Sequence, residues 1–261
     1  MSGLVSIVIP VYNGQEYIKE TLDSIFNQSY RNFEIIVVDG ASTDSTMEIV
    51  AQHRGLIDVI ISEKDEGMYD ALRKGMDKAT GEYLCYINAD DRLLPYTLEK
   101  VVETFEKKNC DLVFGDVNYI NEDGAVIFSY KALPLGYQAI RQLRRVPFAQ
   151  QSSFWTRRIY DKHHGFDKKL KYSADSKFLL SVCLDPAVKK GYVPRPLGEY
   201  RLHGGSFSVS VTGKMQAEHH KMLQELNLPA ASFRKYMYEL YAKARNFKGI
   251  YKKLTYKGNK F

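Results

Sequence analysis

Residues 83–91 are Tyr83-Leu84-Cys85-Tyr86-Ile87-Asn88-Ala89-Asp90-Asp91, and the architecture expected for the rest of the chain follows from them. The first five residues form an apolar run that predicts a buried strand, and two adjacent carboxylates follow it. Ligands of open α/β sheets bind just beyond the carboxyl ends of the strands. Adjacent acids there repel each other unless a positive group lies between them, and a divalent cation shared with substrate phosphates meets that need. A turn with a helix N-cap is the alternative, because Asp suits both.

Predicted strands and helices alternate on both sides of this segment. Apolar runs predict strands at residues 5–10, 33–38, 59–61 and 111–117, and apolar residues at helical spacing predict helices at residues 14–28, 43–54, 68–79 and 94–107. Nearly continuous apolar strands are typical of parallel sheets that are covered on both faces. The order therefore predicts an α/β fold with a mostly parallel central sheet and helices on both faces.

Polar side chains follow three of these strands at corresponding positions. Asp39 ends the second strand, Asp65 closely follows the third, and Asn88, Asp90 and Asp91 end the fourth. Because the carboxyl ends of parallel strands meet at one edge of a sheet, these groups should lie together. Three converging strand ends with acids predict a site for a nucleotide and a metal.

Composition limits the class of protein. The chain has 261 residues, 44% of them hydrophobic and 26% charged, which is ordinary for a globular protein. Its three scattered cysteines, Cys85, Cys110 and Cys183, suggest reduced core thiols in a cytoplasmic protein. We expect no leader peptide and no membrane-spanning segment, because no apolar run approaches the roughly 20 residues that span a bilayer.

The positive charge is concentrated at the C-terminus. Residues 232–261 contain nine Lys or Arg and one acid, a net charge of +8, whereas the whole chain carries +6, so the remainder is nearly neutral. Apolar residues repeat there at alternating spacings of four and three: Phe233, Met237, Leu240, Ala244, Phe247, Tyr251 and Leu254. Such a basic amphipathic helix can lie on an anionic membrane surface. Packing on the body or on a second subunit is the alternative. No RNA-reading motif accompanies the charge, so we expect no nucleic-acid partner.

Four segments together resemble the successive motifs of family 2 glycosyltransferases, which have the GT-A fold. They are Val8–Asn13, Val37–Asp44, Asp65–Ala71 and Asn88–Asp91, in that order. Each motif alone is weak, whereas the ordered set at these spacings is specific. The resemblance extends, with gaps, from residue 5 to about residue 205.

The resemblance implies a donor site for a nucleotide sugar. Its residues are Pro10, Tyr12, Asp39, Asp65, Gly67, Asn88, Ala89 and Asp90. The Asp39 carboxylate would accept from a ring N–H of the base, which favours a UDP-sugar and leaves a GDP-sugar as the alternative. Many members have a second acid where this chain has Gly40. Gly67 would let the backbone approach the nucleotide closely. Asp65 can instead cap the following helix.

The segment Asn88-Ala89-Asp90 corresponds to the DxD motif of the family, with Asn in place of the first acid. The resemblance implies that Asp90 binds Mn²⁺ or Mg²⁺, which would bridge the donor diphosphate. Asn88 can hydrogen-bond the ribose or a metal-bound water, but it removes one negative charge. Asp91 either supports the site from behind or caps a helix.

The second half of the chain should bind the acceptor and supply the base. The segment from Ala149 to Trp155 predicts a central strand, and the resemblance places Gln151 and Trp155 at the acceptor. Asp175 matches the catalytic base of the family. Displacement at an anomeric carbon inverts configuration and needs such a base on the face opposite the departing diphosphate. Capping of the following helix is compatible with this role.

Two basic residues near a Gly-Gly pair complete the candidate site. Arg201 and His203 precede Gly204 and Gly205, and they can touch the diphosphate or the acceptor. A mobile loop that closes over phosphate would use such residues. A turn beside a solvent-exposed His is the alternative.

These features predict an inverting, metal-dependent hexosyl- or N-acetylhexosaminyl-transferase that acts on a saccharide or lipid-linked acceptor. Its setting would be bacterial cell-surface polysaccharide assembly on the cytoplasmic face of the membrane. We expect a catalytic domain at residues 1–210, divided into a donor half (1–117) and an acceptor half (118–210), followed by an amphipathic helical extension at 211–261. The main alternative is a non-catalytic nucleotide-binding scaffold on the same fold, and a homodimer is an open alternative for assembly.

Overall fold

The computed structural model describes residues 3–205, 212–226, 228 and 233–255. Within these residues, nine strands form one mixed sheet in the order β3-β2-β1-β4-β8-β6-β9-β5, with β7 paired to β6. The strands are β1 (Val5–Val11), β2 (Phe33–Asp39), β3 (Val59–Ser62), β4 (Tyr83–Tyr86), β5 (Arg92–Leu93), β6 (Leu112–Ile120), β7 (Val126–Tyr130), β8 (Ser153–Thr156) and β9 (Lys190–Arg201).

The first four strands are parallel, as the sequence predicts. β1 pairs with β2 on one side and with β4 on the other, and β2 pairs with β3. The sequence does not predict the next step, because β8 is inserted between β4 and β6 and runs antiparallel to both. The sequence also does not predict the strands β5 and β7. β6 runs through the predicted boundary at residue 117 between the donor half and the acceptor half. The division into a catalytic domain at 1–210 and an extension at 211–261 stays a prediction.

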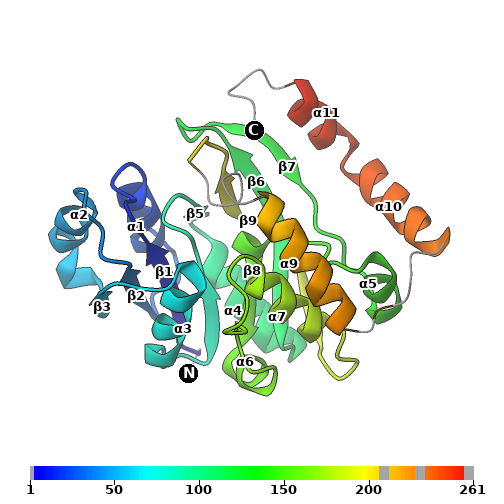
Figure 1. The fold of residues 1–261 in the computed structure, drawn as a ribbon, viewed down its shortest axis with the longest axis horizontal. Coiled ribbons are helices and arrows are strands. Elements are labelled where there is room, and N and C mark those ends of the chain that lie inside the picture. Colours follow the sequence, from blue (N-terminus) through cyan, green and yellow to red (C-terminus); the bar gives the residue numbers. More distant parts are fainter. Residues whose placement is uncertain (1–2, 206–211, 227, 229–232, 256–261) are drawn as a thin grey trace.

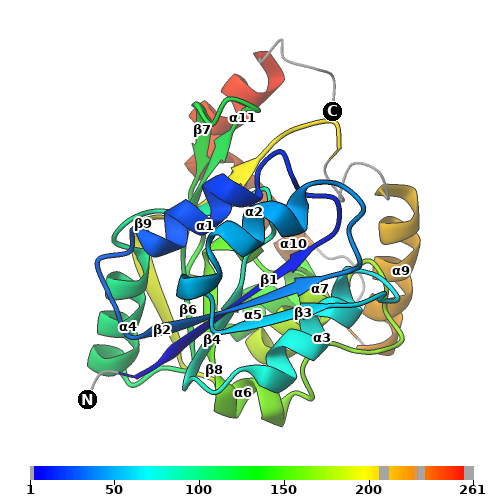
Figure 2. The same ribbon diagram turned by 90° about the vertical axis from the view of Figure 1, so that its left-hand side faces the viewer.

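Helices cover both faces of the sheet (Figures 1 and 2). They are α1 (Ile18–Phe26), α2 (Thr46–Gln52), α3 (Met68–Lys78), α4 (Thr97–Lys108), α5 (Tyr137–Leu143), α6 (Arg157–Lys162), α7 (Ala174–Cys183), α9 (Thr212–Glu225), α10 (Phe233–Arg245) and α11 (Phe247–Thr255). Short 3₁₀ helices occupy Arg54–Leu56 (η1) and Gln150–Ser152 (η2).

Alternation along the strands sorts the core into two layers. In β1, Ile7 and Ile9 pack with α1, α2 and α4 on one face, whereas Val8 packs with α3 and α7 on the other. Both layers are needed because the parallel strands are apolar on both faces. The three cysteines are free and buried, as predicted.

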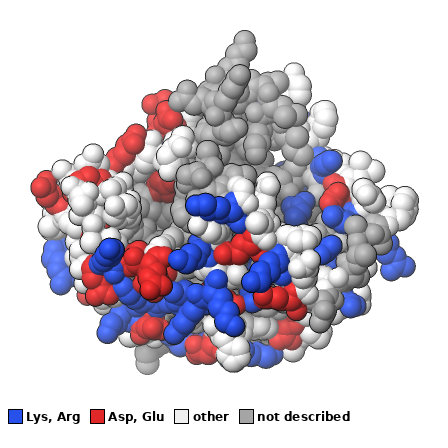
Figure 3. Space-filling view, viewed as in Figure 1, with Lys and Arg blue, Asp and Glu red and all other residues white. Residues whose placement is uncertain are grey.

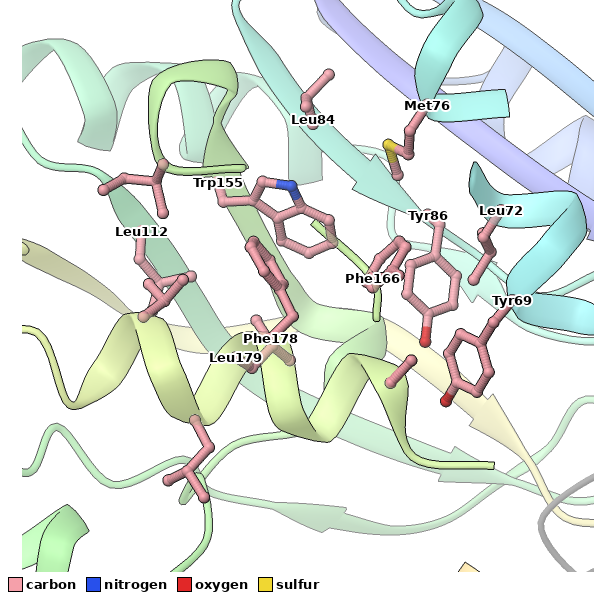
Figure 4. Packing of buried hydrophobic residues seen from close by; sticks show 14 of the residues in the cluster. Tyr69, Leu72, Met76, Leu84, Tyr86, Leu112, Trp155, Phe166, Phe178 and Leu179 are labelled. Carbon is pink, nitrogen blue, oxygen red and sulfur yellow. The ribbon is translucent and has the colours of Figure 1, made fainter. Parts of the chain in front are cut away.

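An aromatic cluster fills the layer between β8, α3 and α7. Phe166 contacts the rings of Tyr69, Tyr86, Trp155 and Phe178 at centroid distances of 5.6–6.2 Å. Figure 4 shows that the hydroxyl groups of Tyr69 and Tyr86 lie at the edge of this cluster, near the start of α7. The cluster therefore brings polar groups from two separate elements to the residues that begin α7.

The C-terminal helices divide into two parts. Met222 of α9 is buried in the main core, so α9 belongs to the body. α10 lies along α5, and α11 lies along β7 (Figure 1). The chain is continuous, but Asn246 separates the two helices. Among the described helices, none is long and apolar enough to cross a bilayer.

Candidate active site at the carboxyl ends of the parallel strands

The predicted donor residues lie at the carboxyl ends of the parallel strands or in the loops that follow them. Asp39 is the last residue of β2, and Asp65 follows the end of β3 by three positions. Residues Asn88 to Asp91 follow β4, the central neighbour of β1. Because these strands share one direction, their loops meet at one edge of the sheet.

Asp39 is a buried carboxylate that already has hydrogen-bond donors. The Ser42 amide donates to both of its oxygens at 3.1 and 3.2 Å, and the Ser62 hydroxyl donates to Oδ2 at 2.6 Å. Asp65 lies beside it, because a Cβ added to Gly40 would be 2.6 Å from the Asp65 Oδ2 atom. The carboxylate of Asp65 thus occupies the space of a side chain at position 40.

A hydrogen bond to the Asp65 carboxylate holds the loop from Asp65 to Gly67 in its conformation. The Gly67 amide donates to Asp65 Oδ1 at 2.8 Å, and Gly67 has a φ of +116°, which favours glycine. No atom lies within 4 Å of a Cβ built on Gly67. The backbone at Gly67, just before α3, is therefore open to a ligand. The Asp65 carboxylate is already used in a hydrogen bond within its own loop.

The loop after β1 presents one free aromatic ring. Pro10 is buried inside β1, whereas Tyr12 is 64% exposed. The loop is tied to the segment after β2, since the Asn13 amide donates to the Ser42 hydroxyl and the Gly14 amide to the Thr46 hydroxyl, each at 2.8 Å. An exposed ring on a fixed loop is suited to stacking against a flat base.

Asn88 and Asp91 form the inner part of the fourth loop. The Asn88 amide group donates to Asp91 Oδ2 at 3.1 Å, and Asn88 Oδ1 is buried without a hydrogen-bond partner among the described residues. Asp91 is fully buried, and burial, followed by the Asp90 charge, raises its pKa well above the usual value. Asp91 supports the loop from behind, and Asn88 Oδ1 is an acceptor that a ligand can satisfy.

Asp90 faces His203, one of the two predicted basic residues. The Asp90 Oδ2 and His203 Nε2 atoms are 2.9 Å apart, and the His203 ring lies against Tyr17 with a centroid distance of 5.0 Å. The structure therefore brings the candidate metal ligand and the loop after β9 together. No group of three or more acidic, His or Cys side chains among the described residues can hold a metal alone.

Arg201 has a different role from the one predicted. Its side chain is fully buried and donates to the Asp90 carbonyl at 2.9 Å, the Glu122 carbonyl at 2.6 Å and the Glu20 carboxylate at 2.7 Å. It also lies over the Tyr17 ring at 4.4 Å. A guanidinium enclosed in this way holds the backbone of Asp90 and has no exposed surface for a diphosphate.

Of the two predicted acceptor residues, Gln151 is partly buried and Trp155 is fully buried. Gln151 donates to Asp91 Oδ2 at 3.1 Å, so its amide is used to support the fourth loop. Trp155 is 0% exposed and packs in the aromatic cluster of Figure 4. Its position in the middle of the sheet, between β4 and β6, leaves its ring no surface to offer an acceptor, which corrects that prediction.

Asp175 lies in the first turn of α7 and is held by two tyrosines. The Tyr69 hydroxyl donates to Oδ1 at 2.6 Å and the Tyr86 hydroxyl to Oδ2 at 3.0 Å. Since Tyr86 ends β4 and Asn88 follows it by two residues, one strand end serves both Asp175 and the acidic loop. Sequence reasoning missed both tyrosines, although each lies within or beside a motif.

Glu218 is another residue that the sequence did not indicate. From α9, its carboxylate accepts from the amides of Lys171 and Tyr172 at 2.9 and 2.8 Å and from the Ser173 hydroxyl at 2.8 Å. These three residues lead directly into α7. Glu218 therefore fixes the segment that carries Asp175, and no local pattern could reveal a contact across 45 residues.

The structural role of Arg201 can be tested by replacing it with methionine. Arg201→Met should lower the free energy of unfolding by about 3 kcal/mol, because four acceptors, including the Asn121 carbonyl, lose a buried charged donor. Urea denaturation measures this loss, and His203→Ala, two residues further on in the loop after β9, serves as the control with a smaller effect. If Arg201→Met unfolds at the parental urea concentration, the enclosed guanidinium is not a structural support.

Comparison with known proteins agrees with this geometry. Residues 6–165 match the family model described as Glycosyl transferase family 2. An uncharacterized glycosyltransferase of Haemophilus influenzae is 31% identical over 243 residues, which cover 86% of this chain and 73% of that protein. TuaG of Bacillus subtilis, named for teichuronic acid biosynthesis, is 31% identical over 134 residues, and the match spans 50% of this chain and 53% of that relative.

Solved structures share the fold at low identity. The Staphylococcus aureus TarS 1–349 complex with UDP-GlcNAc has a TM-score of 0.67 and 19% identity, covering 94% of this chain and 72% of that one. A Pyrobaculum calidifontis mannosyltransferase in complex with GDP-Man and Mn²⁺ has a TM-score of 0.65 and 18% identity, covering 97% and 73%. The α/β fold with helices on both faces is thus the predicted GT-A fold. The chain belongs to glycosyltransferase family 2.

Proposed function

We propose that this protein is an inverting, metal-dependent glycosyltransferase. It moves a hexosyl or N-acetylhexosaminyl group from a nucleotide diphosphate sugar to a hydroxyl of a saccharide or lipid-linked acceptor in cell-surface polysaccharide biosynthesis. The observation that carries the proposal is the end of β4. Tyr86 there holds the carboxylate of Asp175, and the loop with Asn88 and Asp90 follows within four residues.

The donor would bind across the loops after β1, β2, β3 and β4. Tyr12 offers an exposed ring for the base, and Asp65 offers a carboxylate next to Gly40. Asp39 is buried and accepts from Ser42 and Ser62, so it would act on the base by holding the loop after β2 in place. TarS binds UDP-GlcNAc and the mannosyltransferase binds GDP-Man, which supports a nucleotide sugar as the donor class. We favour a UDP-sugar and keep a GDP-sugar as the alternative.

The residues after β4 fit a divalent cation, Mn²⁺ or Mg²⁺. Asp90 would hold it through a carboxylate oxygen, and the unsatisfied Asn88 Oδ1 can accept from a metal-bound water or a ribose hydroxyl. Such a cation neutralises charge on the departing diphosphate. The mannosyltransferase complex contains Mn²⁺, which supports this choice. In the protein itself, Arg201 holds the Asp90 carbonyl, so the loop keeps its shape.

Asp175 would act as the general base. The acceptor hydroxyl gives its proton to the carboxylate while its oxygen forms the new bond to the anomeric carbon. The bond from that carbon to the diphosphate oxygen breaks on the opposite face, so the configuration inverts. Asp175 is partly exposed in the first turn of α7, where an acceptor can reach it.

We further propose that the enzyme works at the cytoplasmic face of the membrane and attaches through α10 and α11. Both helices dock through small or polar residues: Ala242 and Asn246 are buried, and Gly249 lies against the Ser129 carbonyl. The predicted apolar stripe faces outward, with Phe233 77% and Phe247 69% exposed. The side chain of Leu254 lies outside the described residues.

Basic side chains flank this outward face. Those described as exposed are Arg234, Lys243, Arg245, Lys248 and Lys252. Figure 3 shows basic side chains among uncharged and acidic ones on the right-hand side, where α10 and α11 lie in Figure 1. Cations beside exposed apolar groups complement an anionic lipid surface, whereas a second subunit is the alternative occupant.

The metal assignment predicts the behaviour of Asp90→Ala. Its kcat in Mn²⁺ should fall on the order of 10²-fold, because the departing diphosphate loses its charge partner. Release of nucleoside diphosphate from a panel of nucleotide sugars, measured across a metal titration, gives the result. Asp161→Ala, an exposed acid on α6, is the control. Equal activity of Asp90→Ala and parent at all metal concentrations would remove Asp90 from the site.

The base assignment predicts the behaviour of Asp175→Asn. The amide keeps the shape of the side chain but cannot take a proton, so transfer should fall on the order of 10²–10⁴-fold. Binding of UDP or GDP, measured by calorimetry, should remain parental. A variant with a third of the parental rate would contradict general-base catalysis. A parent that binds nucleotide but turns over none of the sugars would instead favour the scaffold.

The membrane assignment predicts the behaviour of the double variant Leu240→Ser, Phe247→Ser. Both side chains are exposed, so the fold should survive while binding to phosphatidylglycerol vesicles weakens roughly 100-fold. High salt should weaken parental binding as well. Leu56→Ser, which removes an exposed apolar group from η1 and leaves the C-terminal helices and β7 unchanged, is the flotation control. Dissociation of a dimer with unchanged vesicle binding would identify the face as a subunit interface.

A further inference from the structure

Asp175 has donors on both of its carboxylate oxygens, and they come from three directions. Oδ1 accepts from the Tyr69 hydroxyl at 2.6 Å and from the Ser176 amide at 2.6 Å, and Oδ2 accepts from the Tyr86 hydroxyl at 3.0 Å. A carboxylate offers about four lone-pair positions, two on each oxygen. Among the described contacts, Oδ1 is fully used and Oδ2 keeps one position.

The two tyrosines cannot turn away from this carboxylate without disturbing the core. Both rings are buried, and each packs against Phe166, with centroid distances of 6.1 Å for Tyr69 and 5.8 Å for Tyr86. Figure 4 shows the two hydroxyl oxygens side by side at the edge of the cluster, close to the start of α7. Packing, rather than the hydrogen bonds alone, sets the direction of both donors.

Both hydroxyls remain protonated donors near neutral pH. Burial, followed by the charge of Asp175, raises the pKa of Tyr69 well above its ordinary value, and the same two causes raise that of Tyr86. Neither group can therefore compete with Asp175 for the proton of an acceptor. Each can only donate, and donation stabilises the ionised carboxylate.

We propose that Tyr69 and Tyr86 are positioning residues that orient the Asp175 carboxylate and present its Oδ2 atom to the acceptor hydroxyl. The inference rests on the proposed role of Asp175 as the base. Two fixed donors restrict rotation of the carboxylate, so the remaining lone pair of Oδ2 keeps one direction. A base held in this way is ready for proton transfer without reorganisation.

Other ionisable groups around Asp175 come from three elements. α3 supplies Tyr69, β4 supplies Tyr86, and α9 supplies Glu218 and His219. Burial, followed by the charge of Arg144, lowers the pKa of His219, so this imidazole is neutral near pH 7. The pH response of the tyrosine variants near neutrality should therefore reflect the carboxylate.

Tyr69→Phe and Tyr86→Phe test the proposal, since each removes one hydroxyl and keeps the ring. In each variant kcat should fall about tenfold, with the donor KM unchanged. The acid limb of the kcat/KM profile should move about one unit to higher pH, because the ionised base loses a donor and protonates more readily. Tyr160→Phe, in the same aromatic cluster but without a contact to Asp175, is the matched control.

The outcomes separate this proposal from the proposed function. If Asp175→Asn is inactive while both phenylalanine variants keep the parental kcat and acid limb, the positioning role is overturned and the base remains. If Asp175→Asn retains transfer, the proposed function fails first. If a phenylalanine variant unfolds in urea before the parent, 3-fluorotyrosine at the same position replaces it. This stronger donor should move the acid limb to lower pH, and an unchanged limb would overturn the proposal.

Discussion

The buried carboxylate of Asp91 is the interaction on which the candidate site depends. It accepts from the Arg201 amide at 3.0 Å and from the side chains of Gln151 and Asn88, each at 3.1 Å. These donors come from β9, η2 and the loop after β4, so one side chain joins three separate parts of the chain. A carboxylate without these donors would be costly to bury. Because the Asp91 carboxylate must keep these hydrogen bonds, the neighbouring residues Asn88 and Asp90 are held in position.

Arg201 completes this arrangement from the other side. Its amide donates to Asp91 and its guanidinium donates to the Asp90 carbonyl, so one residue of β9 holds two consecutive residues of the acidic loop. The loop can therefore present the Asp90 carboxylate outward, toward His203. Residues that resemble substrate ligands in sequence, Arg201 and Gln151, are instead the supports of those that remain free to bind.

Around Asp175 and in the C-terminal helices, too, some residues support the structure and others are left exposed to bind. The aromatic cluster that stabilises the layer under α7 also directs two hydroxyls at Asp175, so core packing and the orientation of the proposed base depend on the same residues. Small or polar residues of α10, of α11 and of the link between them make the contact with the body. Asn246 exchanges hydrogen bonds of 2.6 and 3.1 Å with the backbone of Lys131, which leaves the large apolar side chains outside. The predicted single amphipathic stripe is thus carried by two helices.

Local sequence patterns were sufficient to predict much of the secondary structure and several residues of the candidate site. Apolar runs and helical spacing indicate β1 to β4, their helices and the acids at the strand ends, because each depends on neighbours in sequence and on strand direction. The ordered motifs indicate the family, and the basic tail is evident from composition. Only the tertiary structure decided that β8 runs antiparallel between β4 and β6, that Trp155 is core, that Arg201 is enclosed, and that Tyr69 and Tyr86 meet at Asp175. These outcomes depend on contacts between residues as far apart as 181 positions, as in Glu20 and Arg201, and a pattern within one segment contains no information about its distant partner.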